Sequence, residues 1–299
     1  MPRRPRGVPG PIATLSRDDP GFPTALLPIA RCPDTLFYQG DLDTLRLPAV
    51  AIVGSRAATA VGLETAARLA EGLAAHGVCV VSGLARGVDS AAHRGALRGG
   101  GRTIAVLGSG LDVIYPAEHT GLAGEIAAQG LVLSEYPPGT LPTAFHFPLR
   151  NRLISGLSRA VVVVEAHEQS GSLLTAGFAL DQGREVMAVP GNVLSGRNRG
   201  GHALLRDGAK IVESADDIVW ELGLAPRPAP DAPGGLSVSS STICKDPVLR
   251  VMDVGHPYDL DALAAASGLE GARLLPRLLD LELQGAIRRA PGGRFLRSA

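Results

Sequence analysis

A regular alternation of short apolar runs with helix-like segments is the feature that most constrains this sequence. Between residues 46 and 222, runs rich in Val, Ile and Ala end at Gly or Ser, and each is followed by helical patterning. The runs are apolar at successive positions, so both faces of each strand are expected to be buried. This pattern predicts a doubly wound α/β domain with a mostly parallel sheet of about six or seven strands. The expected strands lie at 49–54, 78–83, 102–110, 131–138, 159–166, 185–192 and 210–214.

The composition changes on both sides of this domain. A segment rich in Pro, Gly and Ser follows Leu222 and is typical of a linker. Three helical patterns and two short strands around a Pro-Gly-Gly turn come after it, and they indicate a small winged-helix domain. The N-terminal segment has several prolines, weak periodicity and one expected helix near residues 23–30. We therefore expect an N-terminal extension at 1–45, an α/β domain at 46–222, a linker at 223–245 and a winged helix at 246–299.

Charge and cysteine content exclude several classes of protein. The chain has 29 basic and 29 acidic residues, which argues against a polybasic coat for nucleic acid but leaves local patches open. Its three cysteines lie far apart without a CxxC pair, so we expect neither a disulfide framework nor a metal site. No apolar run approaches the roughly 18 residues of a membrane span, and the basic start lacks the apolar core of a secretory signal. We expect a cytoplasmic protein.

An arginine stands where a nucleotide-binding turn usually carries more glycine. Gly54 permits a sharp turn after the first strand, Ser55 offers a hydroxyl and an N–H, and Arg56 adds a guanidinium that matches a phosphate. Thr59 is placed to cap the following helix. The chain contains neither G-x-G-x-x-G nor G-x-x-x-x-G-K-[ST], the motifs that usually indicate an NAD site or an ATP site. Binding of NAD or ATP therefore has no support from a sequence motif. The alternative is a tight turn with an exposed arginine.

The stretch FHFPLRNRLISGLSR, residues 145–159, combines aromatic and basic residues. No acidic residue occurs between Glu135 and Glu165. Aromatic rings beside a cationic track suit single-stranded nucleic acid, because rings stack on bases and cations hold phosphates. Alternation around His146 predicts that Phe145 and Phe147 lie on the same side. The alternative is that the two rings are core residues and the arginines cover a helix face.

Gly/Ser turns after two later strands suggest further anion contacts. Ser170, Gly171 and Ser172 could present N–H and hydroxyl groups at a helix N-terminus, although Ser172 could equally be an N-cap. Asp89 and His93 have the spacing of a general-base pair. We favour a structural role for them, with Asp89 capping its helix and His93 closing a local hydrogen bond, because no nucleophile motif such as G-x-S-x-G occurs.

Taken together, these motifs resemble the DNA-processing protein A family (DprA, also called Smf). VAIVGSRAAT, VSGLARGVDSAAHRGAL, FHFPLRNRLISGLSRAVVVVEA and SGSLLTAGFALDQGREVMAVPGN occur in the order and spacing of that family, from about residue 22 to residue 222. The C-terminal segment resembles the winged helix that many members carry. The resemblance also implies that only the last part of an N-terminal helical domain remains in residues 1–45.

The resemblance implies an extended Rossmann-like fold and a non-enzymatic role without a cofactor. Members of the family bind single-stranded DNA, form homodimers, and load RecA recombinase onto incoming strands in natural transformation. Arg56 would hold a phosphate, with Gly54 and Ser55 supplying N–H groups, and Phe147 would stack on a base. The DNA-binding residues implied in this chain are Gly54, Ser55, Arg56, Thr59, Phe147, Arg150, Asn151, Arg152, Ser170, Gly171, Ser172, Gly191, Asn192 and His202.

Three positions depart from the family pattern. Ala144 and Gln169 stand where relatives often carry a basic residue, and His202 stands where many carry Asn. The first two changes remove positive charge and predict weaker or more salt-sensitive binding. Four other cations could compensate: Arg184, Arg197, Arg199 and Lys210.

Two other functions remain open. A similar Rossmann variant occurs in phosphoribohydrolases, but SGSLLTAG lacks the double glycine and the catalytic glutamate of their PGGxGTxxE pattern. Alternatively, the winged helix could read duplex DNA as part of a regulator, with arginines such as Arg297 near its wing. Acidic residues in the expected recognition helix, including Asp280 and Glu282, weigh against that reading.

Overall fold

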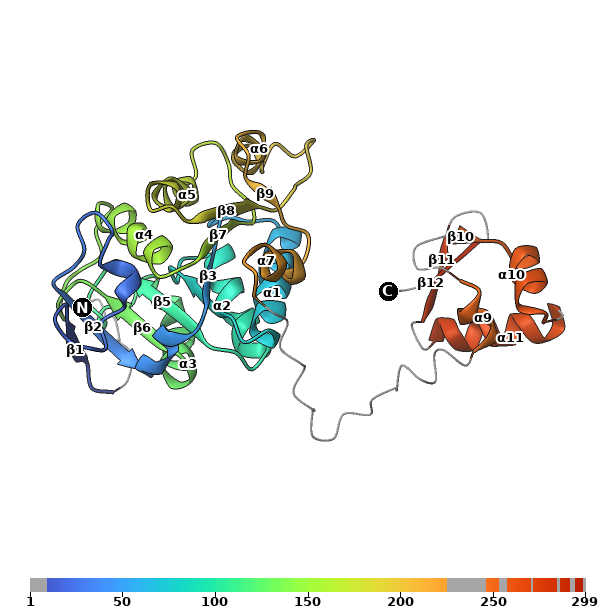
Figure 1. Ribbon diagram of the computed structural model, residues 1–299, viewed down its shortest axis with the longest axis horizontal. Helices are drawn as coiled ribbons and strands as arrows, with labels where there is room; N and C mark the ends of the chain where they lie inside the picture. The colour runs from blue at the N-terminus through green and yellow to red at the C-terminus, as the bar shows by residue number, and fades with distance from the viewer. Residues whose placement is uncertain are drawn as a thin grey trace. The chain divides into compact units, whose positions relative to one another are not determined.

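The structure is a computed structural model that describes residues 10–224, 246–252, 257–269, 271–283, 286–290 and 294–297. The chain divides into two compact units, Met1–Pro230 and Asp231–Ala299 (Figure 1). Most of the expected linker, from residue 225 to 245, lies outside the described residues, as do residues 1–9. Among the described helices, none combines the length and the apolar character needed to cross a membrane.

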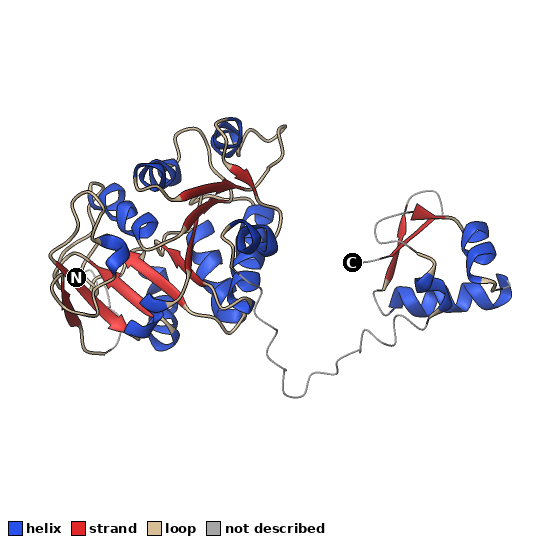
Figure 2. Cartoon of the chain, in the orientation of Figure 1, coloured by secondary structure: helices blue, strands red, loops and turns tan. Residues whose placement is uncertain are grey.

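The described residues of the first unit form a nine-stranded sheet in the order β1-β2-β6-β5-β4-β3-β7-β8-β9 (Figures 1 and 2). Seven strands, β3 to β9, are parallel to one another. At the β6 edge the sheet is extended by β2 and then β1, which pair in antiparallel fashion. All seven predicted strands are present, and the predicted doubly wound class is confirmed. The strands are β1 (Ala13–Ser16), β2 (Thr35–Gly40), β3 (Ala49–Val53), β4 (Cys79–Ser82), β5 (Thr103–Leu107), β6 (Leu131–Ser134), β7 (Ala160–Val163), β8 (Glu185–Ala188) and β9 (Lys210–Ile211).

Helices cover both faces of the sheet, as continuous apolar strands require. In β3, Ala51 and Val53 pack into the core beneath α4 and α5, whereas Val50 and Ile52 pack against α1, α2 and α7. A third cluster joins α3 to β5 and β6. The helices are α1 (Ala60–Ala75), α2 (Val88–Arg98), α3 (Thr120–Gln129), α4 (His146–Gly156), α5 (Gly171–Asp181), α6 (Arg199–Arg206) and α7 (Ala215–Glu221).

The N-terminal segment is built differently from the prediction. The prediction of a helix near residues 23–30 is wrong, because only a short 3-10 helix forms there, at Thr24–Leu26. Pro28 stops it, because proline lacks the N–H donor that a longer helix would need there. Strands β1 and β2, which the sequence reading missed, pair along residues 13–16 and 35–38 and join this segment to the main sheet.

The strand order places a switch point next to β3. The chain runs outward from β3 through β4 and β5 to β6, then returns to pair β7 with the other side of β3. At such a point the flanking loops diverge and leave a crevice outside the carboxyl ends of the strands. The turn Gly54–Arg56 and the segment after β7 therefore border the place where this fold binds ligands.

The second unit has a three-helix, three-strand architecture in its described residues, and the predicted winged helix is confirmed. Leu263, Leu274, Leu278 and Phe295 are among the residues of its own apolar core. Pro276 lies inside the third helix. The elements are α9 (Pro247–Arg250), β10 (Pro257–Tyr258), α10 (Leu260–Ser267), α11 (Gly271–Leu283), β11 (Ile287–Ala290) and β12 (Arg294–Arg297).

Candidate functional site

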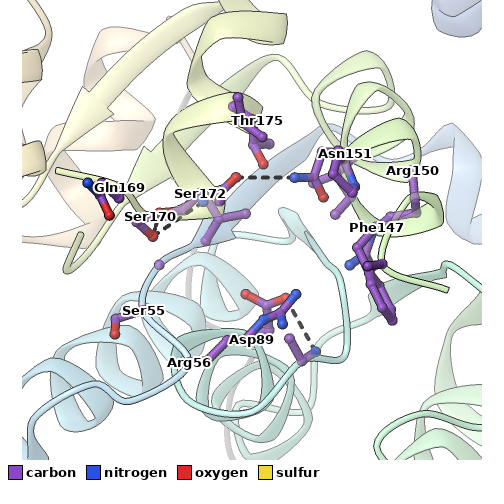
Figure 3. Close-up of a pocket in the computed structure, with 18 of the residues that line it drawn as sticks. Ser55, Arg56, Asp89, Phe147, Arg150, Asn151, Gln169, Ser170, Ser172 and Thr175 are labelled. Carbon is purple, nitrogen blue, oxygen red and sulfur yellow. Dashed lines mark hydrogen bonds between the residues drawn. The ribbon is translucent and has the colours of Figure 1, made fainter. Parts of the chain in front are cut away.

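A cavity of 760 Å³ opens at the carboxyl edge of the sheet, at the switch point (Figure 3). This volume lies in the range of sites that hold small organic ligands. Its walls are the turn after β3, the first turn of α4 and the N-terminus of α5. Nine of the predicted site residues line it: Gly54, Ser55, Arg56, Phe147, Arg150, Asn151, Ser170, Gly171 and Ser172.

The turn after β3 is held tightly by its neighbours. The Ser55 N–H donates to the Glu165 carbonyl at 2.6 Å, and the Ser55 carbonyl accepts from Val88 N–H at 3.2 Å. A Cβ on Gly54 would lie 2.6 Å from Val88 Cγ2, so the turn needs glycine there. The expectation that the Ser55 N–H is available to a phosphate is therefore wrong. The turn presents the exposed Arg56 guanidinium instead.

The N-terminus of α1 is already occupied by a carboxylate. Thr59 caps the helix by accepting from Gly62 N–H at 3.0 Å, as predicted. Its hydroxyl donates to Glu165 Oε2 at 2.6 Å, and its N–H lies 3.2 Å from both carboxylate oxygens. Thr59 does not line the cavity. The sequence reading missed the buried Glu165, although its position directly after β7 was a signal. Because this carboxylate takes the place of an anion at the helix dipole, the N-terminus of α1 is not available to an anionic ligand.

Phe147 and Arg56 form the aromatic and cationic part of the cavity wall. The Arg56 Cζ lies 5.4 Å from the centroid of the half-buried Phe147 ring, and the Tyr115 ring centroid lies 5.5 Å from it. Phe145 is 70% exposed and lies outside the cavity lining. The prediction that both rings share one side is wrong. Helix α4 begins at His146, and residues two apart near a helix diverge by about 200°.

Arg150 is a buried cation at the base of the cavity. It is 3% exposed, and its Nη1 donates to the carbonyls of Gly83, at 2.7 Å, and Val106. These bonds tie the end of β5 to the residue that follows β4. Burial lowers the pKa of Arg150 to about 10, with Asp89 opposing the shift, so the side chain stays charged at neutral pH. Arg150 thus adds positive potential at the base of the cavity, while its Nη1 is committed to two backbone carbonyls.

Arg152 points away from this cavity. It makes a two-pronged ion pair with Glu135, at 2.6 and 3.1 Å, and donates to the Arg31 carbonyl at 2.8 Å. Of the two arginines in the RNR motif, the structure brings Arg150 to the cavity and places Arg152 between α4 and the N-terminal segment. The two-residue spacing on a helix causes the difference.

Asp89 and His93 do not form a catalytic pair. The Asp89 carboxylate accepts from Gly83 N–H at 3.1 Å and Ala85 N–H at 3.3 Å. His93 is fully buried, with Nδ1 2.7 Å from Thr103 Oγ1, and burial lowers its pKa to about 3. Both residues therefore have structural contacts, and the hydrogen bond expected of His93 is present. The expectation that Asp89 caps its helix is wrong, because the N-cap of α2 is Gly87 and Asp89 accepts from N–H groups of the preceding loop.

The N-terminus of α5 supplies neutral polar groups. Ser170, rather than Ser172, is the N-cap, and the two hydroxyls lie 2.7 Å apart. Asn151 Nδ2 donates to the Gly171 carbonyl at 3.2 Å, which joins α4 to α5 across the cavity (Figure 3). These side chains are donors and acceptors suited to a phosphate or a base edge.

The last three predicted residues lie outside the cavity lining. His202 Nε2 lies 3.1 Å from the Gly191 carbonyl, and Asn192 Oδ1 accepts from Leu194 N–H at 2.8 Å. Gly191, Asn192 and His202 therefore shape the loop between β8 and α6. That loop returns toward the cavity, because Arg197 Nη1 donates to the Ala57 carbonyl at 3.3 Å.

The fold and the cavity define a Rossmann-like α/β binding domain, followed along the chain by a winged-helix unit. Residues 13–223 match the family described as DNA recombination-mediator protein A, and residues 226–293 match the DprA winged helix domain. The chain belongs to the DNA recombination-mediator protein A family.

Relatives in several bacteria support this assignment. The chain is 48% identical to DNA processing protein DprA of Streptococcus pneumoniae over 203 residues, 68% of this chain and 72% of that protein. It is 40% identical to protein Smf of Escherichia coli over 283 residues, 93% and 76% of the two chains. The chain is also similar to a solved structure of DNA processing protein A from Helicobacter pylori, which is described for its single-stranded DNA binding mode. The two have a TM-score of 0.66 and 32% identity, and the match covers 72% of this chain and 97% of that one.

Proposed function

We propose that this protein binds single-stranded DNA at the cavity and promotes the loading of RecA recombinase onto incoming strands in natural transformation. The observation that carries the proposal is the Arg56 guanidinium beside the Phe147 ring at the carboxyl edge of the sheet. A phosphate and its base need such a cation and such a ring side by side. The relative from Helicobacter pylori, whose structure concerns single-stranded DNA binding, supports the choice of ligand.

The cavity assigns a task to each of its groups. Arg56 holds a backbone phosphate, because it is exposed and has no ion pair among the described residues. Phe147 stacks on a base, while Asn151 and the hydroxyls of Ser170 and Ser172 donate to phosphate or base edges. Arg150 contributes charge from below. Glu165 keeps the strand off the α1 N-terminus.

The remaining parts of the proposal rest on family membership. The protein acts as a cytoplasmic homodimer that hands its strand to RecA, and it needs no cofactor. The Rossmann-like domain at 46–222 does the binding, with the extension at 1–45, the linker at 223–245 and the winged helix at 246–299 as accessory parts.

A non-enzymatic role agrees with the chemistry of the cavity. The acidic side chain that lines it, Asp89, is committed to two backbone N–H groups and lies beside Arg150. A hydrolase of nucleoside monophosphates needs a carboxylate free to activate water. We expect no free base on incubation with nucleoside monophosphates, and its release would revive the hydrolase alternative.

Fluorescence anisotropy with labelled oligothymidylate and a matching duplex, over several salt concentrations, tests the proposed binding. We expect the wild type to prefer the single strand, with log K falling by about 0.7 per phosphate contact against log salt. Arg56→Ala should weaken binding and make this slope shallower. Equal binding of duplex with no effect of Arg56→Ala would overturn the proposal.

A further inference from the structure

Of the four cations that could compensate for Ala144 and Gln169, two are committed to other partners. Arg184 is not available, because its Nη2 donates to the carbonyls of Ala25, at 3.1 Å, and Gly156, at 3.2 Å. Lys210 is paired with Glu221 and lies 3.6 Å from Glu185. Arg197 and Arg199 remain. Both are exposed and neither has a carboxylate partner among the residues that the structure describes.

The loop that carries Arg197 and leads into Arg199, the first residue of α6, is held by side-chain hydrogen bonds. Asn198, 3% exposed, donates to the Val189 carbonyl at 2.9 Å and accepts from Ala166 N–H at 2.9 Å, which fastens the loop to the end of β7. A Cβ on Gly191 would lie 2.6 Å from Asn198 Nδ2, so the loop base packs closely. The Ser195 hydroxyl donates to the Asn192 carbonyl at 2.9 Å and closes the tip.

The tip of this loop exposes two apolar side chains. Val193 is 74% exposed and Leu194 is 92% exposed, although the loop around them is tightly hydrogen-bonded. Arg197 contacts the Ala57 carbonyl, one residue beyond Arg56. Two adjacent apolar residues are thus followed by Arg197 in the loop and by Arg199 at the start of α6, and Arg197 reaches the turn that carries Arg56.

We propose that residues 192–199 form a second contact surface for the same strand. Arg197 and Arg199 bind phosphates of the nucleotides that continue past Arg56, and Val193 and Leu194 contact the faces of their bases. This inference rests on the proposed single-stranded DNA binding and adds a site for the neighbouring nucleotides. The loop supplies cations in a chain that carries Ala144 and Gln169 in place of basic residues.

Oligonucleotide length separates this surface from the central cavity. The full-length chain is tested by anisotropy against oligothymidylates of about four and about sixteen nucleotides. The variant is Arg197→Ala with Arg199→Ala. The control is Arg94→Ala with Arg159→Ala, which removes the same charge from two exposed arginines that do not line the cavity. A further variant, Val193→Ser with Leu194→Ser, tests the base contacts.

We expect the loop variant to bind the short oligonucleotide as tightly as the control and the long one about tenfold more weakly. Its salt slope on the long oligonucleotide should fall by about 1.4, for two lost phosphate contacts. Val193→Ser with Leu194→Ser should weaken long-strand binding without changing the slope.

Two results would overturn this inference. One is that the loop variant and the control bind the short and the long oligonucleotide with the same affinities. The other is that the loop variant loses affinity equally for both oligonucleotides, which would place the loop in the central site. If Arg56→Ala still weakens binding to both oligonucleotides in these cases, the proposed function stands while the second surface fails. If the wild type does not prefer single strands, the proposed function itself fails.

Discussion

At the scale of single residues, the two phenylalanines of the FHF motif have different surroundings. Phe147 contacts Arg56 and Tyr115 at the cavity wall, whereas Phe145 is exposed outside it. We expect Phe147→Leu to weaken single-strand binding by about 1–3 kcal/mol, the usual value of one stacked base. Phe145→Leu should have a smaller effect. Anisotropy at one fixed salt concentration compares them, and a larger loss for Phe145→Leu would move the stacking site outside the cavity.

A single buried histidine makes the stability of the first unit depend on pH. Thr103 Oγ1 donates to the Val80 carbonyl at 2.6 Å and so accepts from His93 Nδ1–H. Burial holds the pKa of His93 at about 3 in the folded state, against about 6.5 when unfolded. The unfolded state therefore binds an extra proton as the pH falls from about 6.5 toward 3.

We expect the free energy of unfolding to fall over this range by up to about 1.4 kcal/mol per pH unit. Urea titrations of the wild type and of His93→Gln at pH 7 and pH 5 measure the effect. The variant is less stable at pH 7 but should lose less stability on acidification. An equal loss in both proteins would assign the pH dependence to other groups.

At the scale of elements, the N-terminus of α1 depends on a contact between residues 106 positions apart. Thr59 caps the helix and also donates to Glu165, so one hydroxyl serves two partners. Thr59→Ala should cost about 1–2 kcal/mol of stability. Glu165→Gln should cost about the same, since it removes a buried charge from the helix N-terminus.

The two changes should not be additive, because Thr59→Ala removes the hydroxyl that donates to Glu165 and Glu165→Gln removes the charge that strengthens the same hydrogen bond. Chemical denaturation of wild type, single variants and the double variant gives the coupling free energy. We expect the double variant to be more stable than the sum of the single losses indicates. Additive losses would mean that Glu165 and Thr59 act independently on α1.

Elements also differ in how well the sequence predicts them. The parallel strands were predictable because each is a short Val- and Ile-rich run bounded by glycine or serine. Strands β1 and β2 were not, because their side chains are only partly buried and they pair with each other and with β6, far along the chain. Helix α7 was also missed, although Ser214 and Asp217 form a capping box there.

At the scale of the whole molecule, the winged helix is poorly suited to reading duplex DNA. Leu275 and Leu279 are 53% and 50% exposed on α11, where a DNA-reading helix would present polar side chains. Arg277 on the same helix is paired with Asp246 at 2.5 Å and lies 3.8 Å from Asp280. Arg297 donates to the Leu249 and Met252 carbonyls of its own unit.

A chain ending at residue 230 should therefore keep its affinity for single strands within about twofold, since the cavity lies wholly in the first compact unit. Anisotropy on this truncated chain and on the full-length chain makes the comparison. Circular dichroism of the truncated chain serves as the folding control. Loss of binding by a folded truncated chain would instead make the winged helix part of the DNA site.

Sequence alone determined the parallel sheet, the Gly54–Arg56 turn at its carboxyl edge and the family to which the chain belongs, because strand patterning and turn residues act over a few positions. Tertiary structure decided which groups were free to act. In the folded chain the Ser55 N–H donates to the Glu165 carbonyl, and Arg152 is paired with Glu135. The Arg56 guanidinium lies beside the Phe147 ring. Each of these contacts joins segments brought together only by folding, and hydrogen-bond capacity used there is no longer available to a ligand.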